Sequence, residues 1–176
     1  MVNTINETEI LERLNDAPSV RGYFIAAVDI FSDAINDLME RIFRKDNFAV
    51  QSVVGPLLQD TGPLGNRSVR LKLLYGLGVV ADDVYHDIEC FIKIRNLLNK
   101  DGSEYTFTDP NIVSQIKELN LVKKSGIVPF DTVDPDLDID LDFYHLQLQR
   151  QQRMIKSGLS LAIIEICNDL NKESPF

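Results

Sequence analysis

Histidine and cysteine, which supply many catalytic groups and most zinc ligands, are scarce in this chain of 176 residues. It contains two of each: His86, His145, Cys90 and Cys167. The cysteines form no CxxC pair and no Cys/His spacing, so the sequence predicts buried, reduced thiols rather than a disulfide or a metal site. No Ser-His-Asp, Cys-His or phosphate-loop arrangement can be assembled either. We therefore expect no enzyme activity, no cofactor and no metal.

Long apolar runs are also missing. No segment has the continuous apolar length that a membrane span requires. The polar N-terminus, with Asn3, Asn6, Glu7 and Glu9, lacks the basic and apolar regions of a secretory signal. These features predict a cytoplasmic protein without a membrane partner. With 44% hydrophobic residues, the chain is suited to one compact domain over residues 1–176.

Apolar residues recur mostly at helical spacing, which predicts an all-α, single-domain bundle of about six to eight helices without a significant sheet. One long helix is expected from about Ser19 to Arg44. Its apolar seam consists of Phe24, Val28, Phe31, Ile35, Leu38 and Ile42. A final helix is expected from about Phe143 to Leu170, with a second half that is apolar on almost every side. Either helix could serve the core or the interface of a homodimer.

The stretch from Pro56 to Gly78 combines turn residues, clustered cations and two glycines inside a helical pattern. We expect an ordered turn up to Asn66 and then a helix that stops near Gly78, with a close helix contact at Gly76. Arg70 falls inside the apolar arc of that helix. A guanidinium remains charged when it is buried, so Arg70 is predicted to be a structural buried charge with a carboxylate, carbonyl oxygens or an anion as partner.

An acidic loop is predicted over about residues 121–142. Six aspartates without a lysine or arginine between them define it: Asp131, Asp134, Asp136, Asp138, Asp140 and Asp142. The loop lacks the glycine turn and the terminal glutamate of an EF-hand, so we expect an exposed or partner-covering segment rather than a calcium site.

Charge argues against a standard DNA-binding motif. The net charge is −9 and the isoelectric point is about 4.7. A helix predicted from Asp82, its expected N-cap, to Leu98 follows a short turn and superficially resembles a recognition helix. It carries Asp82, Asp83, Asp87 and Glu89 against Lys93 and Arg95, so phosphates would repel the end expected to enter a major groove.

Several irregular motifs in order carry a family resemblance. They are FRKD from Phe43, PLL from Pro56, GPLG from Gly62, SVRLKLLYGLGV from Ser68 and DGSEYTFTD from Asp101. Together they resemble the bacterial mannitol operon repressor family. The resemblance implies a cytoplasmic, all-helical regulator that lowers the expression of genes for mannitol uptake and use.

We interpret the protein as a regulator that binds another protein, either in transcription or in sugar-transport regulation. The residues expected to form the partner-binding surface are Arg44, Lys45, Arg67 and Lys72, extended by Arg95, Asn99 and Asp101. From Arg41 to Lys72, six cations stand against the two acids Asp46 and Asp60. Direct binding of operator DNA by this non-standard basic face is the alternative.

Overall fold

The computed structural model describes residues 6–43, 48–125 and 141–172, and these ranges form eight helices and no strand. The expected all-α single-domain fold is therefore confirmed. The helices are α1 (Glu7–Asn15), α2 (Val20–Phe43), α3 (Phe48–Leu58), α4 (Arg67–Gly76), α5 (Asp82–Leu98), α6 (Pro110–Ile116), α7 (Asn120–Ser125) and α8 (Leu141–Leu170). No helix in these ranges is both long enough and apolar enough to cross a membrane.

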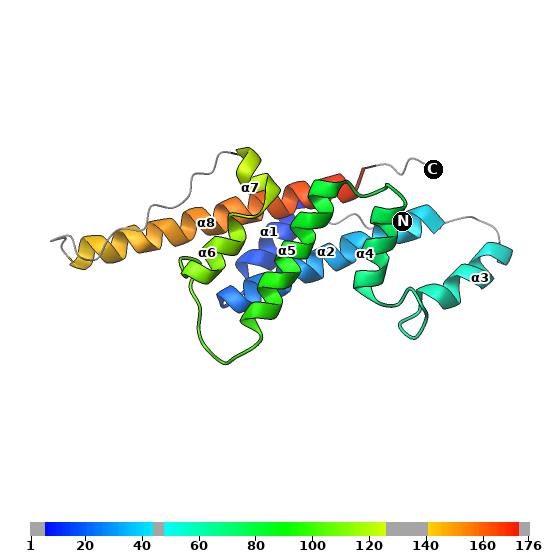
Figure 1. Cartoon of the computed structure of the whole chain (residues 1–176), viewed down its shortest axis with the longest axis horizontal. Coiled ribbons are helices and arrows are strands. Elements are labelled where there is room, and N and C mark those ends of the chain that lie inside the picture. The colour runs from blue at the N-terminus through cyan, green and yellow to red at the C-terminus, as the bar shows by residue number, and fades with distance from the viewer. Residues whose placement is uncertain (1–5, 44–47, 126–140, 173–176) are drawn as a thin grey trace.

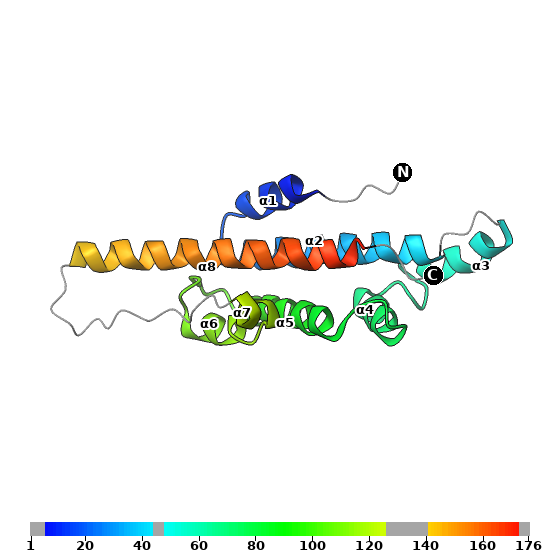
Figure 2. The ribbon, with the colours of Figure 1, turned by 90° about the horizontal axis from the view of Figure 1, so that it is seen from above.

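The helices form three layers. Figure 2 shows α1 on one side, α2 and α8 in the middle, and α4 to α7 on the other side. In both views α3 lies beyond one end of the body, and the first half of α8 extends beyond the other (Figures 1 and 2). The middle layer is the centre of the core, because α2 contacts α1, α4, α5 and α8.

The apolar seam of α2 explains its central position. Its members Phe24, Val28, Phe31, Ile35 and Leu38 are all buried, while Ile42 is half-buried. Phe31 packs edge-to-face on Phe91 of α5, with 5.2 Å between ring centroids. Ser19 lies just before the helix, and its Oγ accepts a hydrogen bond from the Gly22 amide at 3.0 Å. Because the hydrophobic effect favours burial of these apolar side chains, the seam is the main driving force for packing α2 at the centre of the core.

Two arginines on α2 bind the ends of other helices. Arg21 donates to the carbonyl oxygens of Leu98 at 2.9 Å and of Asp101 and Ser103 at 2.8 Å, beyond the end of α5. Arg41 donates to the carbonyl oxygens of Leu170 (2.6 Å), Asn171 (3.2 Å) and Lys172 (3.0 Å), at the end of α8. Carbonyl groups at a helix C-terminus lack intrahelical partners and carry partial negative charge, so a guanidinium stabilises them.

Asp87 of α5 caps the N-terminal end of another helix, α7. Its side chain is buried, and its carboxylate oxygens accept hydrogen bonds from the amides of Asn120 at 2.7 Å and Leu121 at 3.1 Å. These are the first two amides of α7, which have no acceptor within the helix. Burial raises the pKa of the Asp87 carboxyl, and the two amide hydrogen bonds oppose that shift.

Several local predictions need correction. Pro56 lies inside α3 rather than in a turn, and this helix was not expected. Ala81, not Asp82, is the N-cap of α5, and it makes no side-chain cap bond. The helix stops near Gly78, as expected: α4 ends at Gly76, Leu77 is its C-cap, and Gly78 follows with φ of 73°. A Cβ at Gly76 would meet nothing within 4 Å, so the predicted close contact is absent.

Within the predicted acidic loop, residues 121–125 belong to α7 and residues 141–142 begin α8. The aspartates at 131, 134, 136, 138 and 140 lie outside the described residues.

Arg41 provides a direct test of the helix-end contacts. Replacing Arg41 with methionine keeps the apolar stem but removes its three hydrogen bonds to the end of α8. We expect the free energy of unfolding to fall by about 2–3 kcal/mol, because hydrogen bonds from charged donors are the stronger class. Urea denaturation followed by circular dichroism measures the change.

Arg13→Met is the matched control, because Arg13 pairs with Asp33 at 2.8 Å on a solvent-exposed face. It should cost about 0.5 kcal/mol. If the free energy of unfolding fell equally in the two variants, the contacts of Arg41 at the end of α8 would contribute no more to stability than an exposed ion pair.

Candidate partner-binding surface

Arg70 connects three separate segments. Its guanidinium donates to the Leu58 carbonyl oxygen at 2.5 Å, to the Leu64 carbonyl oxygen and to Oδ1 of Asn36 on α2. The side chain is half-buried, which is less burial than the sequence suggested. Its partners are neutral oxygens, so no carboxylate or anion is needed to account for it.

Arg70 supports a turn over residues 59–66 that two glycines allow. A Cβ on Gly62 would lie 2.6 Å from the Leu57 carbonyl oxygen, and one on Gly65 would lie 2.5 Å from the Asp60 carbonyl oxygen. Real Cβ atoms do not approach an oxygen so closely, so both positions require glycine. The turn is thus packed against the end of α3 and tied to α2 by Arg70.

A polar cleft of about 560 Å³ opens beside this turn. It lies between α2, the 59–66 turn, α4 and α5. Its lining is mainly polar and cationic: Ser32, Asn36, Asp60, Gly65, Asn66, Arg67, Ser68, Arg70, Ile92 and Arg95. The structure therefore brings Arg67 and Arg95 together, although 27 residues lie between them in the sequence.

The two outer arginines of the cleft are weakly engaged. Arg67 lies 3.8 Å from Oδ1 of Asp29, and both side chains are more than one third exposed. Arg95 donates to Oδ1 of the neighbouring Asn96 at 3.2 Å. Exposed pairs of this kind contribute little to stability, so both guanidinium groups can exchange these contacts for groups of a partner.

The remaining predicted residues do not join the cleft lining. Lys72 is exposed on α4, and Asn99 is the C-cap of α5. Asp101 lies in the loop after α5, where its carboxylate accepts hydrogen bonds from the Ser103 amide at 3.0 Å and the Tyr105 hydroxyl at 2.9 Å. These bonds, the Ser103 amide first, lower the pKa of Asp101. Arg44 and Lys45 lie outside the described residues.

Sequence reasoning did not identify Asn36 and Ser32 as cleft residues or Arg21 as the support of the 101–103 loop. Asn36 falls on the solvent side of the α2 pattern and gives no sign of its contact with Arg70. The arginine in the first turn of α2 was the one available signal, since a cation there is unfavourable for its own helix dipole and needs a partner elsewhere.

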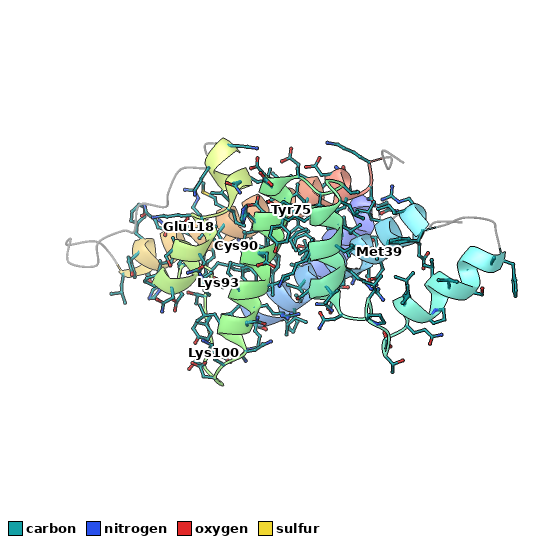
Figure 3. The ribbon with its side chains drawn as sticks, turned by 45° about the vertical axis from the view of Figure 1, so that its right-hand side comes forward. Met39, Tyr75, Cys90, Lys93, Lys100 and Glu118 are labelled. Atoms are coloured by element: carbon teal, nitrogen blue, oxygen red, sulfur yellow. The ribbon has the colours of Figure 1, made fainter. Side chains whose placement is uncertain are left out.

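A second groove of about 830 Å³ lies between α5 and α6. Figure 3 shows four of its lining residues, Cys90, Lys93, Lys100 and Glu118, on this face. Burial raises the pKa of the Cys90 thiol to about 11, so the thiol stays protonated and is a poor nucleophile. Within the described ranges, no three histidine, cysteine or acidic side chains are placed to hold a metal ion.

The placement of α5 bears on DNA binding. Its residues Val84, Ile88, Phe91, Ile94 and Leu98 are buried in the core. The exposed face that remains begins with Asp82 and continues through Glu89, and the side chain of Asp83 pairs with Lys124. A recognition helix needs a protruding, cationic N-terminal turn, and α5 has the opposite charge at that end.

Comparison with known proteins gives consistent matches over almost the whole chain. A family model described as "Mannitol repressor" matches residues 6–171. The mannitol operon repressor of Escherichia coli K12 is 40% identical over 171 residues, which cover 97% of this chain and 85% of that protein. A protein named Fumarase E, also from E. coli K12, is 26% identical over 171 residues, covering 95% of this chain and 98% of that protein.

A solved structure is similar as well. The chain in the X-ray structure of the MtlR–HPr complex from E. coli has a TM-score of 0.85 and 41% sequence identity, and the match covers 93% of this chain and 97% of that chain.

Arg70→Lys tests whether one guanidinium organises the turn. Lysine keeps the positive charge but lacks the planar fork that reaches three oxygens on separate segments. We expect a loss of about 1–3 kcal/mol in the free energy of unfolding, together with faster proteolytic cleavage within residues 59–66. Arg95→Lys, a matched change in the same cleft, should alter neither measurement appreciably. Unchanged cleavage in Arg70→Lys would remove the turn-supporting role.

Proposed function

Because the chain belongs to the mannitol repressor family, we propose that it lowers the expression of mannitol genes by binding the protein HPr rather than by reading operator DNA. The observation that carries the proposal is the similarity in sequence and fold to the E. coli chain that was solved with HPr. Conservation of the backbone over almost the whole chain gives a partner-binding surface the same scaffold in both proteins.

Charge and packing support a protein partner over DNA. The chain carries a net charge of −9, which opposes long-range attraction to phosphates. Three of its arginines donate to backbone carbonyl oxygens within the fold: Arg21, Arg41 and Arg70. Arginines held in this way add little to a phosphate-binding face. The described part of the chain therefore offers less positive charge to phosphates than a count of its arginines and lysines suggests.

We further propose that the partner contacts the cleft through Arg67 and Arg95. Both are partly exposed and weakly engaged, and both line the cleft beside the turn that Arg70 supports. Carboxylates of a partner suit such a pair, because a guanidinium binds a carboxylate with two parallel hydrogen bonds. Lys72, Asn99 and Asp101, together with Arg44 and Lys45, stay in the proposal as the surroundings of this contact.

Two further points belong to the same proposal. The protein acts in the cytoplasm, where the regulated genes and transcription components are. It also forms a homodimer, whose interface the sequence placed on the α2 seam or on the final helix. The α2 seam is covered within one chain. Leu159, Ile163 and Ile166 in the second half of α8 are buried as well, whereas Leu161 is exposed.

Charge reversal in the cleft tests the partner-binding surface. The double variant Arg67→Glu/Arg95→Glu should weaken capture of purified HPr by roughly tenfold or more, since truncating or reversing contact charges typically costs that much. Titration calorimetry measures the affinity, and circular dichroism confirms the helical content. Retention of full affinity would contradict a contact at the cleft.

Arg150→Glu/Arg153→Glu is the matched control, because it changes the net charge equally at two exposed positions of α8. It should bind HPr as the unchanged protein does. Loss of binding in this variant alone would place the contact on α8 instead. A mobility-shift titration with mannitol promoter DNA completes the comparison, and tight, sequence-selective binding by the protein alone would support the DNA-binding alternative.

We also propose that the protein is not an enzyme. Because one relative is named Fumarase E, fumarate hydration is the activity to test. His86 and His145 are exposed and lie on different helices, and the described residues contain no metal-ligand cluster. Hydration of fumarate, followed by its ultraviolet absorbance with and without divalent metals, should therefore not exceed the uncatalysed rate. Turnover that increases in proportion to protein concentration would overturn this part of the proposal.

A further inference from the structure

Helix α3 is apolar yet largely exposed. Its eleven residues, FAVQSVVGPLL, include no charged side chain. Phe48 is 83% exposed and Val53 is 66% exposed, while Val54 and Leu58 are only half-buried. A helix that is apolar on most sides is normally covered by protein, and an exposed apolar patch marks an interaction surface.

We propose that α3 packs against α3 of a second copy of this chain across a two-fold axis, forming a reversible homodimer. This inference rests on the homodimer proposed above and names its contact surface, and it does not depend on HPr binding. A two-fold contact pairs a surface with itself, so each residue meets a copy of the same surface. Such pairing favours a patch that carries no charge, and α3 provides one.

Electrostatics favours α3 over the other exposed apolar helix. Two copies of a chain with a net charge of −9 repel each other over most of their surfaces. The first half of α8 also exposes apolar residues, among them Phe143, Leu146 and Met154. That segment carries Arg150, Arg153 and Lys156 close by, so self-pairing there would bring like charges together. Self-pairing of α3 brings no charged side chains of the helix together.

The position of α3 makes this contact sterically accessible. Figures 1 and 2 show the helix beyond one end of the elongated body. Two copies that meet through this helix can therefore point their bodies in opposite directions. Arg70 holds the end of α3 through the Leu58 carbonyl oxygen at 2.5 Å, which presents the helix in a defined orientation and lowers the entropy cost of association.

The size of the patch predicts a weak dimer. Eleven residues make a helix about 16 Å long. A contact between two helices of this length is small beside the roughly 1,200 Å² that marks the lower bound of stable protein interfaces. We therefore expect monomer and dimer to exchange, with a dimer fraction that rises as the protein concentration rises.

Sedimentation equilibrium over a roughly hundredfold range of concentration tests the dimer. The unchanged protein should move from monomer toward dimer, and Val53→Asp should stay monomeric. Leu161→Asp is the matched control, since Leu161 is 64% exposed on α8 and Val53 is 66% exposed on α3. This control should dimerise as the unchanged protein does. A protein that stays monomeric throughout, or a Val53→Asp variant that dimerises normally, would overturn the proposal.

A cysteine trap locates the contact independently. Under mild oxidation, Val53→Cys should form a disulfide-linked dimer, whereas Met154→Cys, also at an exposed position, should remain monomeric. The native thiols interfere little, because burial raises the pKa of Cys90 to about 11 and of Cys167 to about 12. Cross-linking of Met154→Cys alone would move the interface to α8 and overturn the assignment to α3.

HPr capture by the same variants separates the two proposals. The cleft lining includes no residue of α3, so Val53→Asp should bind HPr with unchanged affinity while losing the dimer. Loss of HPr binding in this variant, with the unchanged protein monomeric at all concentrations, would identify α3 as part of the HPr contact and reject self-association.

Discussion

The fold depends on the contacts that α2 makes both along its length and near its two ends. Its apolar seam is covered by helices from both outer layers and by α8 beside it. Arg21 and Arg41 then bind carbonyl groups at the ends of α5 and α8. Burial alone lets packed helices slide along one another, because the hydrophobic effect is non-directional. A guanidinium fixed to a helix end restricts that sliding, since its hydrogen bonds have a defined geometry.

The positive charge of the chain is therefore divided between two uses. Arg21, Arg41 and Arg70 are held by carbonyl oxygens within the fold, whereas Arg67 and Arg95 face the cleft with weak partners. Counting cations along the sequence merges these groups and suggests a basic face suited to phosphates. The described structure instead supports a small polar cleft on an acidic protein, which is better matched to groups of a protein partner.

The sequence predicted those parts of the structure in which residue type alone determines the environment. The α2 seam was predictable because large apolar residues at helical spacing must be buried, and the αL conformation of Gly78 was predictable because few other residues adopt it. Carbonyl oxygens were among the partners expected for Arg70, but the particular groups that it binds were not predictable, because backbone carbonyl groups carry no sequence signature. Helix α3 was also missed, since Gly55 and Pro56 resemble a turn and the helix lacks the polar face that defines an amphipathic pattern.

The helix-end contacts of Arg21 and Arg41 also determine how the fold responds to its solvent. A guanidinium does not lose its proton in the physiological range, and a carbonyl oxygen does not gain one. Acid therefore leaves these hydrogen bonds intact while it neutralises the exposed carboxylates around them. Salt screens them weakly as well, because the acceptors are dipoles rather than ions. In an acidic protein, the contacts that fix α5 and α8 to α2 are thus insensitive to changes in pH and only weakly sensitive to ionic strength.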